Sequence, residues 1–204
     1  MGLHNNAAEG GNMIFVKVKM GKEGENPGLF QREQIDGQWT NTRIDQDTAS
    51  GTISKVKTQV NKHDKWGTMR SVSVTLKEPM EDPVNIEIPI QSSTMSAINS
   101  LLSCEIGQFV NIQPGYRKSK NNSMSKTIWV TGEDKKTISW AYELGELPEV
   151  KVVEIKGTKM YDDDLRMDFL VAKLKDRFEG DDQPEEVAQP EPAAVADDPS
   201  DLPF

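Results

Sequence analysis

The sequence predicts a mainly β domain with one internal helix, followed by a second helix and an acidic tail. Several short segments between residues 13 and 131 alternate apolar and polar side chains, and this period of two is typical of half-buried strands. One segment departs from that period, because Met95, Ile98, Leu101 and Leu102 are spaced as the apolar stripe of a helix. A length of 204 residues with 35% hydrophobic residues fits one modest domain plus a tail.

The alternating segments are separated by polar or glycine-containing connections. An N-terminal strand is expected at 13–20 and a short strand at 37–44, with a loop at 21–28 between them. The central elements are expected to be strands 52–60, 69–76 and 84–90, a helix at 93–104, and strands 108–113 and 126–131. Polar loops at 61–68 and 117–125 join the first two and the last two of these strands, and further strand patterns occur at 137–142 and 150–155.

A second helix is expected at 161–178. Its apolar residues Met167, Leu170, Val171, Leu174 and Phe178 share one face. Residues 162–164 are all Asp and are expected in its first turn, where negative charge stabilises the helix dipole. Three adjacent side chains do not converge on one side of a helix, so we interpret them as helix-start stabilisation rather than as a metal site.

The order strand–strand–strand–helix–strand–strand is that of an oligonucleotide/oligosaccharide-binding (OB) barrel. We therefore predict an all-β fold with added helices, in which residues 13–160 form an OB-fold barrel with an extra N-terminal strand. An SH3-like barrel and a split β-sandwich are the alternatives. Residues 1–12 are expected to be a flexible N-terminus, and the helix at 161–178 follows the barrel.

Residues 179–204 are predicted to be a disordered acidic tail. They contain nine acidic residues, five prolines and no Lys or Arg, so they cannot bury enough apolar surface to offset chain entropy. The tail nevertheless ends on Leu202, Pro203 and Phe204 behind a cluster of carboxylates. Such a tip suits a small pocket with a basic rim on a partner protein. The alternative is a solubilising tail whose last residues are incidental.

This tail resembles the C-terminal tip of bacterial and phage single-stranded-DNA-binding proteins (SSBs), which typically ends Asp-Asp-Ile-Pro-Phe. Residues 201–204 match the last four positions with Leu in place of Ile, whereas Pro199 and Ser200 interrupt the acidic run. The resemblance implies an OB domain that coats single-stranded DNA (ssDNA). It also implies a tip that recruits replication, recombination or repair proteins, formed here by Asp197, Asp198, Asp201, Leu202, Pro203 and Phe204.

The chain departs from the bacterial SSB pattern in its extra N-terminal strand, its second helix and its lack of a Gly/Gln-rich spacer. These departures favour a monomer or dimer over the bacterial tetramer. The resemblance is to the phage-encoded kind of SSB, which implies a protein that acts in the host cytoplasm. The single Cys excludes an internal disulfide and fits a reducing cytoplasm. We expect no membrane span and no signal peptide.

Charge and aromatic residues gather where an OB barrel meets its ligand. Residues 1–178 contain 24 Lys+Arg and 24 Asp+Glu, so the net charge of −9 belongs to the tail and does not exclude a nucleic-acid groove. An OB barrel binds through its second and third strands and through the loops between strands 1–2 and 4–5. The DNA-binding residues predicted there are Lys55, Lys57, Lys62, Lys65, Trp66, Arg70, Tyr116, Arg117, Lys118, Lys120, Lys126 and Trp129.

In this prediction the basic side chains follow the phosphates and the rings stack on unpaired bases. The alternative for each lysine is a solvated position, and for Tyr116 and Trp129 a packing role. Trp39 and Trp140 are expected to be packing residues.

The sequence offers little for catalysis. Its two histidines, His4 and His63, have no zinc-ligand spacing, and no nucleotide-phosphate loop or nucleophile motif occurs. Asp45 and Asp47 lack the Gly and Glu that would complete a calcium loop, and Cys104 is expected to be a buried apolar residue. We therefore expect a non-enzymatic protein without cofactors. The alternatives to ssDNA binding are an OB-fold protein-interaction adaptor and a nuclease accessory subunit.

Overall fold

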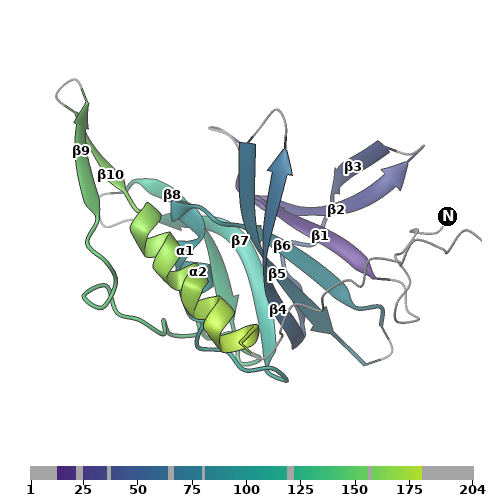
Figure 1. Cartoon of the computed structure of the whole chain (residues 1–204). Helices are drawn as coiled ribbons and strands as arrows, with labels where there is room; N and C mark the ends of the chain where they lie inside the picture. The colour runs from purple at the N-terminus through teal and green to yellow at the C-terminus, as the bar shows by residue number, and fades with distance from the viewer. Residues whose placement is uncertain are drawn as a thin grey trace, which may run out of the picture.

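The computed structural model describes residues 13–21, 25–35, 38–63, 67–79, 81–118, 122–155 and 158–180. The chain is mostly β, with one large mixed sheet, one separate two-stranded ribbon and two α-helices (Figure 1). No helix in these ranges is both long and apolar enough to cross a membrane. The predicted flexible N-terminus and residues 181–204 of the predicted tail lie outside the described residues. Glu179, the first residue of the predicted tail, is instead the C-cap of the second helix, with its amide donating to the carbonyl of Lys175.

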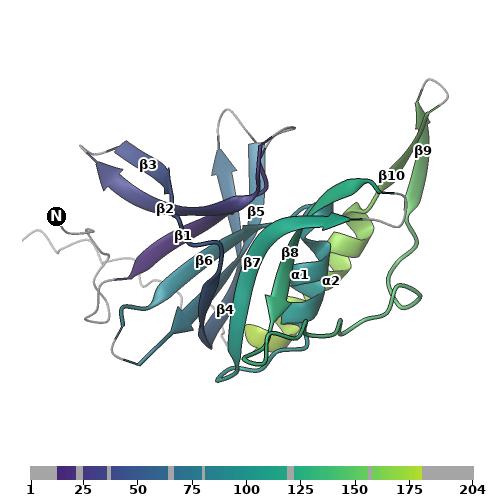
Figure 2. The same cartoon turned by 180° about the vertical axis from the view of Figure 1, so that it is seen from behind.

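The large sheet has eight strands in the order β3-β2-β1-β6-β5-β4-β7-β8. Their bounds are β1 Ile14–Lys19, β2 Gly28–Ile35, β3 Gln38–Arg43, β4 Ala49–His63, β5 Gly67–Lys77, β6 Val84–Pro89, β7 Phe109–Lys118 and β8 Met124–Thr131. All neighbours are antiparallel except β1 and β6, which pair in parallel. The view from behind shows the sheet curling strongly, with β1–β3 on one side and β7–β8 on the other (Figure 2).

The predicted OB barrel is not confirmed, because no sheet closes among the described residues. The five strands expected to form it, β4 to β8, do lie side by side in the order β6-β5-β4-β7-β8. Closing them would require β6 to pair with β8. The free edge of β6 is instead taken by β1, with Ile14 opposite Val84 and Val16 opposite Ile86.

Most of the predicted strands are present, with shifted ends. Strand β2 was not expected, because residues 21–35 carry polar side chains at most positions. β4 continues to His63 and β5 begins at Gly67, so the polar connection predicted at 61–68 is largely strand. The segment 137–142 is not a strand: it makes a single bridge, between Thr137 and Thr131. The pattern at 150–155 became β9 (Lys151–Ile155), which pairs with β10 (Thr158–Asp162).

The internal helix is shorter than 93–104. A 3₁₀ turn at Ser92–Thr94 leads into α1 (Met95–Leu101). The chain then tightens, because the amides of Ser103 and Cys104 donate to the carbonyls of Ser100 and Leu101, three residues back. Gly107, with φ of +90°, ends the turn in the left-handed region that favours glycine.

The second helix, α2, spans Asp164–Phe178. The prediction of a helix start at 161 was wrong, because β10 takes residues 158–162 into pairing with β9 and Asp163 becomes the N-cap. Only Asp164 of the three aspartates lies in the first helical turn. The predicted apolar face is confirmed at three of its five positions, since Met167, Leu170 and Leu174 are buried in the core. Phe178 is partly buried against the core and Val171 is half-buried.

The core lies on one face of the curled sheet, beneath both helices. Alternate residues of the central strands supply it, together with Ala97, Ile98 and Leu101 of α1. Hydrogen bonds fix α2 over this face: Arg177 Nη2 donates to the carbonyl of Cys104 (2.9 Å), and the amide of Thr58 on β4 donates to Glu179 Oε1 (2.5 Å). Asp168 of α2 forms an ion pair with Arg70 of β5.

Asn99 of α1 is fully buried and fastens the segment that follows β8. Its Nδ2 donates to the carbonyl of Tyr142 (2.8 Å), and its Oδ1 accepts from the amides of Ala141 and Tyr142 (both 3.1 Å). The side chain thereby satisfies the amide and carbonyl of Tyr142, and it shares the amide of Ala141 with the backbone carbonyl of Asn99 (3.2 Å), as residues 137–142 pass over α1.

We expect Asn99→Ala to lower the free energy of unfolding by about 2–4 kcal/mol, because buried backbone groups lose their partners. Asn99→Asp should also be destabilising, because it keeps the acceptor for the two amides but places a buried carboxyl group against the carbonyl of Tyr142. Urea unfolding followed by circular dichroism measures both. Equal stability of Asn99→Ala and the parent would contradict the role given to this side chain.

Candidate nucleic-acid interface

The strand register sorts the side chains of β1–β6 onto two faces. One face is the core. The other, which we call the basic face, carries the alternate residues, including Lys17, Lys19, Arg32, Lys55 and Lys57. Among the described strand residues on this face the one carboxylate is Glu87. A β-bulge at Ser54 sets the register in β4: Ile53 lies opposite Leu76, and the next paired residue, Lys55, lies opposite Thr75.

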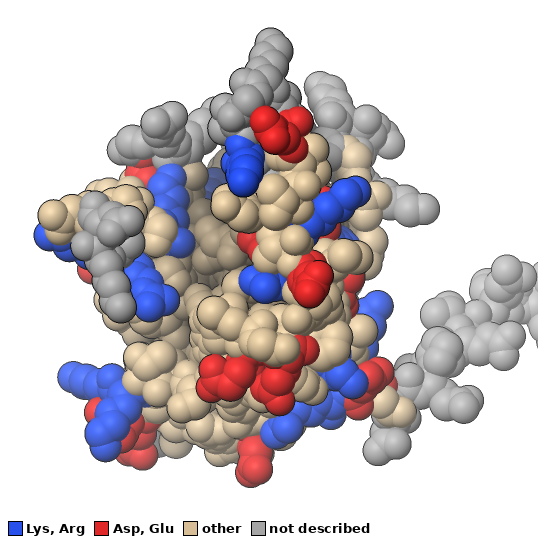
Figure 3. Space-filling view, turned by 90° about the vertical axis from the view of Figure 1, so that its left-hand side faces the viewer, with Lys and Arg blue, Asp and Glu red and all other residues tan. Residues whose placement is uncertain are grey.

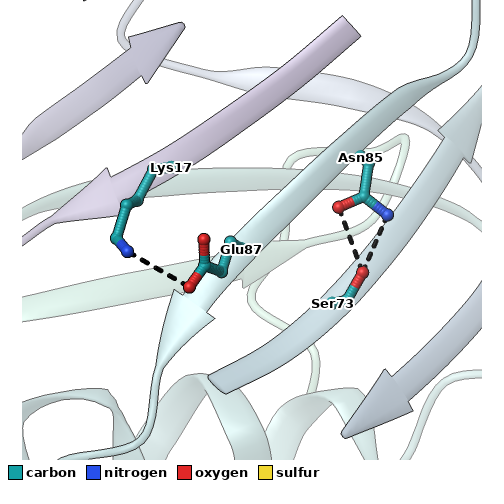
Figure 4. A network of polar contacts seen from close by, with 4 residues as sticks. All are labelled: Lys17, Ser73, Asn85 and Glu87. Carbon is teal, nitrogen blue, oxygen red and sulfur yellow. Dashed lines mark hydrogen bonds and ion pairs between the residues drawn. The ribbon is translucent and has the colours of Figure 1, made fainter. Parts of the chain in front are cut away.

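Polar contacts connect the strands across the middle of the basic face (Figure 4). Lys17 Nζ lies 3.1 Å from Glu87 Oε1, with the two side chains 24% and 17% exposed. Asn85 Nδ2 donates to the hydroxyls of Ser73 (2.7 Å) and Thr75 (3.1 Å). The Lys17–Glu87 pair neutralises the acid, so the remaining charge of the face is positive.

Aromatic rings lie between the cations on the β1–β3 side of this face. Phe15 is 36% and Trp39 is 50% exposed. The guanidinium of Arg32 lies 4.6 Å from the centre of the Trp39 ring, and Lys19 Nζ lies 4.4 Å from that of Phe30. These cation–π contacts hold the rings against the sheet. The expectation that Trp39 is a packing residue was wrong, because β3 is an edge strand and no element of the described part of the chain covers its ring.

The basic face is hollowed near its centre. A small pocket of about 110 Å³ is lined by residues of four strands, among them Phe15, Lys17, Arg32 and Gln59. Residues from β1, β2 and β4 reach one pocket because the sheet curls toward this side. Ser71, Ser73 and Thr75 of β5 are buried although they lie on the basic face.

Only two of the twelve predicted DNA-binding residues lie on this face within the described part of the chain. Lys55 is exposed and Lys57 is half-buried there. Arg70 lies on the core side of the sheet instead. It is paired with Val60 in the β4–β5 register, and its guanidinium forms an ion pair with Asp168 of α2. Lys65, Trp66 and Lys120 lie outside the described residues, as do the predicted partner-binding residues Asp197, Asp198, Asp201, Leu202, Pro203 and Phe204. Lys62 belongs to β4, and its side chain is also outside the description.

Tyr116 and Lys126 face each other across β7 and β8 and fix the connection between β1 and β2. The Tyr116 hydroxyl donates to the carbonyl of Glu25 (3.0 Å), and Lys126 Nζ donates to that of Gly21 (2.9 Å). These two residues therefore stabilise the curl of the sheet. Lys118 is exposed at the end of β7.

Arg117 and Trp129 project from the other side of β7 and β8 and line a separate pocket of about 380 Å³. We call it the tryptophan pocket, because Trp140 also lines it, together with Ser96, Ser100, Thr127, Ile128, Val130 and Thr137. Trp140 is half-buried here rather than packed in the core. Figure 3 shows the molecule from the side on which β9, β10 and α2 lie in Figure 1; Lys and Arg side chains, with some Asp and Glu, border a hollow in the upper half of that surface.

Gly115 makes room for the Trp129 ring. A Cβ atom on Gly115 would lie 2.3 Å from Cζ3 of Trp129, far inside contact distance. The ring thus lies directly on the β7 backbone.

A third hollow, of about 780 Å³, is acidic and does not suit a phosphate chain. Its lining includes Asp45, Glu78, Glu81 and Asp82 against Arg43. No group of three or more His, Cys, Asp or Glu in the described ranges is placed to hold a metal ion. Burial of Cys104 raises the pKa of its thiol to about 11, although Arg177 opposes the shift, so the thiol is neutral and unreactive near pH 7.

No family model, curated protein or solved structure matches this chain.

We expect Gly115→Ala to displace the Trp129 ring and to destabilise the fold by about 1–3 kcal/mol, because a buried methyl group would overlap the indole. Gly145→Ala is the matched control, since a Cβ there meets no atom within 4 Å. Tryptophan emission and urea unfolding measure the two effects. An unchanged spectrum and stability in Gly115→Ala would show that the ring does not occupy this place.

Proposed function

We propose that this protein is a non-enzymatic ssDNA-binding protein whose basic face holds the strand. The observation that carries the proposal is the interleaving of cations and exposed rings on one side of the sheet. Lys17, Lys19, Arg32, Lys55 and Lys57 share that side with Phe15 and Trp39. Basic residues that track a phosphate backbone and rings that receive bases are the two components of ssDNA binding.

The charge balance supports a polyanionic ligand. Among the described strand residues of this face, the one carboxylate, Glu87, is already paired with Lys17, so these residues present no uncompensated negative charge to an incoming phosphate. Neutralising phosphates releases condensed counterions, which supplies affinity without sequence preference.

The exposed rings favour single strands over duplexes. A ring can stack only on a base whose own faces are free, and in a duplex neighbouring base pairs cover those faces. Phe15 and Trp39 project from a sheet surface. They can therefore reach the bases of a flexible strand that is laid across the face.

We also propose that strands β4–β8 are an opened OB barrel, with β1–β3 inserted where the barrel would close. The support is the order β6-β5-β4-β7-β8 and the helix α1 between the third and fourth of these strands. The outer side of β5 and β6, where an OB barrel holds its ligand, then coincides with the centre of the basic face.

The acidic tail extends the proposal to partner proteins. Its last four residues, Asp201–Phe204, resemble the SSB tip, and we propose that they recruit replication, recombination or repair proteins. The tail follows α2, and α2 is hydrogen-bonded to β4 through Glu179 and Thr58. The tip is therefore tethered to the DNA-binding domain by about two dozen residues.

Oligo-dT binding measured by fluorescence anisotropy tests the proposal. We expect tight binding to oligo-dT, weaker binding to a duplex of equal length, and an affinity that falls with salt by a log–log slope of about −0.7 per phosphate contacted. Lys55→Gln should reduce the magnitude of that slope by about 0.7.

Lys175→Gln is the matched control, because it removes the same charge from an exposed position on α2, on the core side of the β4–β5 hairpin. Its slope should equal that of the parent. If oligo-dT affinity is flat with salt, or if both variants change the slope equally, the basic face does not hold the strand and the adaptor alternative is favoured.

Deletion of Phe204 separates recruitment from DNA binding. We expect oligo-dT affinity to stay unchanged, because no side-chain charge is removed, and capture of replication or repair proteins from a host lysate to be lost. Capture that persists after the deletion would assign the tail a solubilising role only.

A further inference from the structure

The tryptophan pocket is a second concave site, separate from the basic face. It lies among α1, β7, β8 and the segment 137–140, and its volume of about 380 Å³ is in the range of small-molecule sites. None of the basic-face cations lines it. Its composition is unusual for a surface hollow, since two half-buried indoles, Trp129 and Trp140, and one guanidinium, that of Arg117, share the lining.

The two indoles are held in place by different means. The Trp129 ring lies on the bare backbone of Gly115. Trp140 belongs to a segment fixed on both sides: Ile138 N donates to the carbonyl of Val130 (2.9 Å), and the amide of Ala141 donates to Asn99 Oδ1 (3.1 Å). The pocket is therefore preorganised, so a ligand would not bear the entropy cost of ordering it.

The polar lining can recognise the edge of a planar group. Ser96 Oγ and Thr127 Oγ1 lie 3.1 Å apart, and either hydroxyl can be the donor. This pair can thus present a proton or a lone pair to a ligand. Aromatic walls, an adaptable hydroxyl pair and a single cation match a planar aromatic ring that carries one anionic group.

We propose that the tryptophan pocket binds one nucleotide, with its base against Trp129 and Trp140 and its phosphate at Arg117. The nucleotide is either free or a single unstacked residue of a DNA strand, and the strand form rests on the function proposed above. Ring stacking supplies the contact to the base, and the guanidinium pairs with the phosphate.

Fluorine NMR of the full-length protein labelled with 5-fluorotryptophan tests this assignment. The chain has four tryptophans, so four signals result, and Trp39→Phe, Trp129→Phe and Trp140→Phe assign three of them. We expect dTMP to shift the signals of Trp129 and Trp140 in a saturable manner and to leave that of Trp39 unchanged. Oligo-dT should shift all three.

The two ligands separate this proposal from the proposed function. A shift of Trp39 alone with oligo-dT, and no shift with dTMP, overturns the pocket assignment and leaves the basic face intact. Shifts of Trp129 and Trp140 with dTMP, together with no binding of oligo-dT, support a free nucleotide as the ligand and overturn the strand form.

Two variants test the roles of ring and cation. Trp140→Ala should weaken dTMP binding by roughly 5-fold to 100-fold, the range of one base–ring stack. Arg117→Gln should lower the affinity for dTMP to that for thymidine, because only the phosphate contact is lost, whereas Lys175→Gln should keep the difference between the two ligands. Arg117 is exposed at the end of β7, so its replacement tests the assignment even if Trp140→Ala fails to fold. An Arg117→Gln protein that still prefers dTMP over thymidine as strongly as the parent overturns the phosphate assignment.

Discussion

The parallel pairing of β1 with β6 is the constraint on which the rest of the structure depends. It brings together residues about 70 positions apart, and it buries Val16 against Ile86 in the core. Because β1 occupies the edge that β6 would need to close a barrel with β8, the sheet remains open and widens to eight strands. The same pairing places Lys17 beside Glu87, so one backbone contact determines both the open architecture and the charge of the basic face.

Local patterning predicted the elements better than their assembly. Strands β1, β4, β5, β6, β7 and β8 follow from alternation, and the buried face of α2 follows from its helical spacing, because both depend on near neighbours in the chain. The pairing of β1 with β6 depends on residues distant in sequence, so local patterning did not predict it, and the closed OB barrel is not confirmed. Strand β2 was missed because its polar residues Gln31, Arg32 and Glu33 hide the alternation, although hydrogen bonds to β1 and β3 on both edges satisfy its backbone.

The candidate site was predictable only in part, for a related reason. Counting cations and aromatic rings by loop selected Arg70, Tyr116 and Lys126, but strand register and long-range partners give these three structural roles. Lys17, Arg32 and Trp39 were missed because each lies in a strand whose neighbour could not be inferred. The available signal was the alternation of basic and aromatic side chains with apolar ones in residues 14–19, which marks a strand with one charged face.

The bulge at Ser54 has a consequence for how this protein can vary in evolution. Ile53 and Val56 both face the core although they differ in parity along the strand, and the extra residue makes this possible, with Ser54 Oγ donating to the carbonyl of Thr75 (3.1 Å). Deleting Ser54 would restore regular alternation in β4, and every other side chain of the strand would stay on its present face. A gain or loss of one residue elsewhere in the paired part of β4 would exchange Lys55 and Lys57 with core positions. Relatives with a β4 of different length should therefore differ at the bulge and conserve the spacing on either side of it.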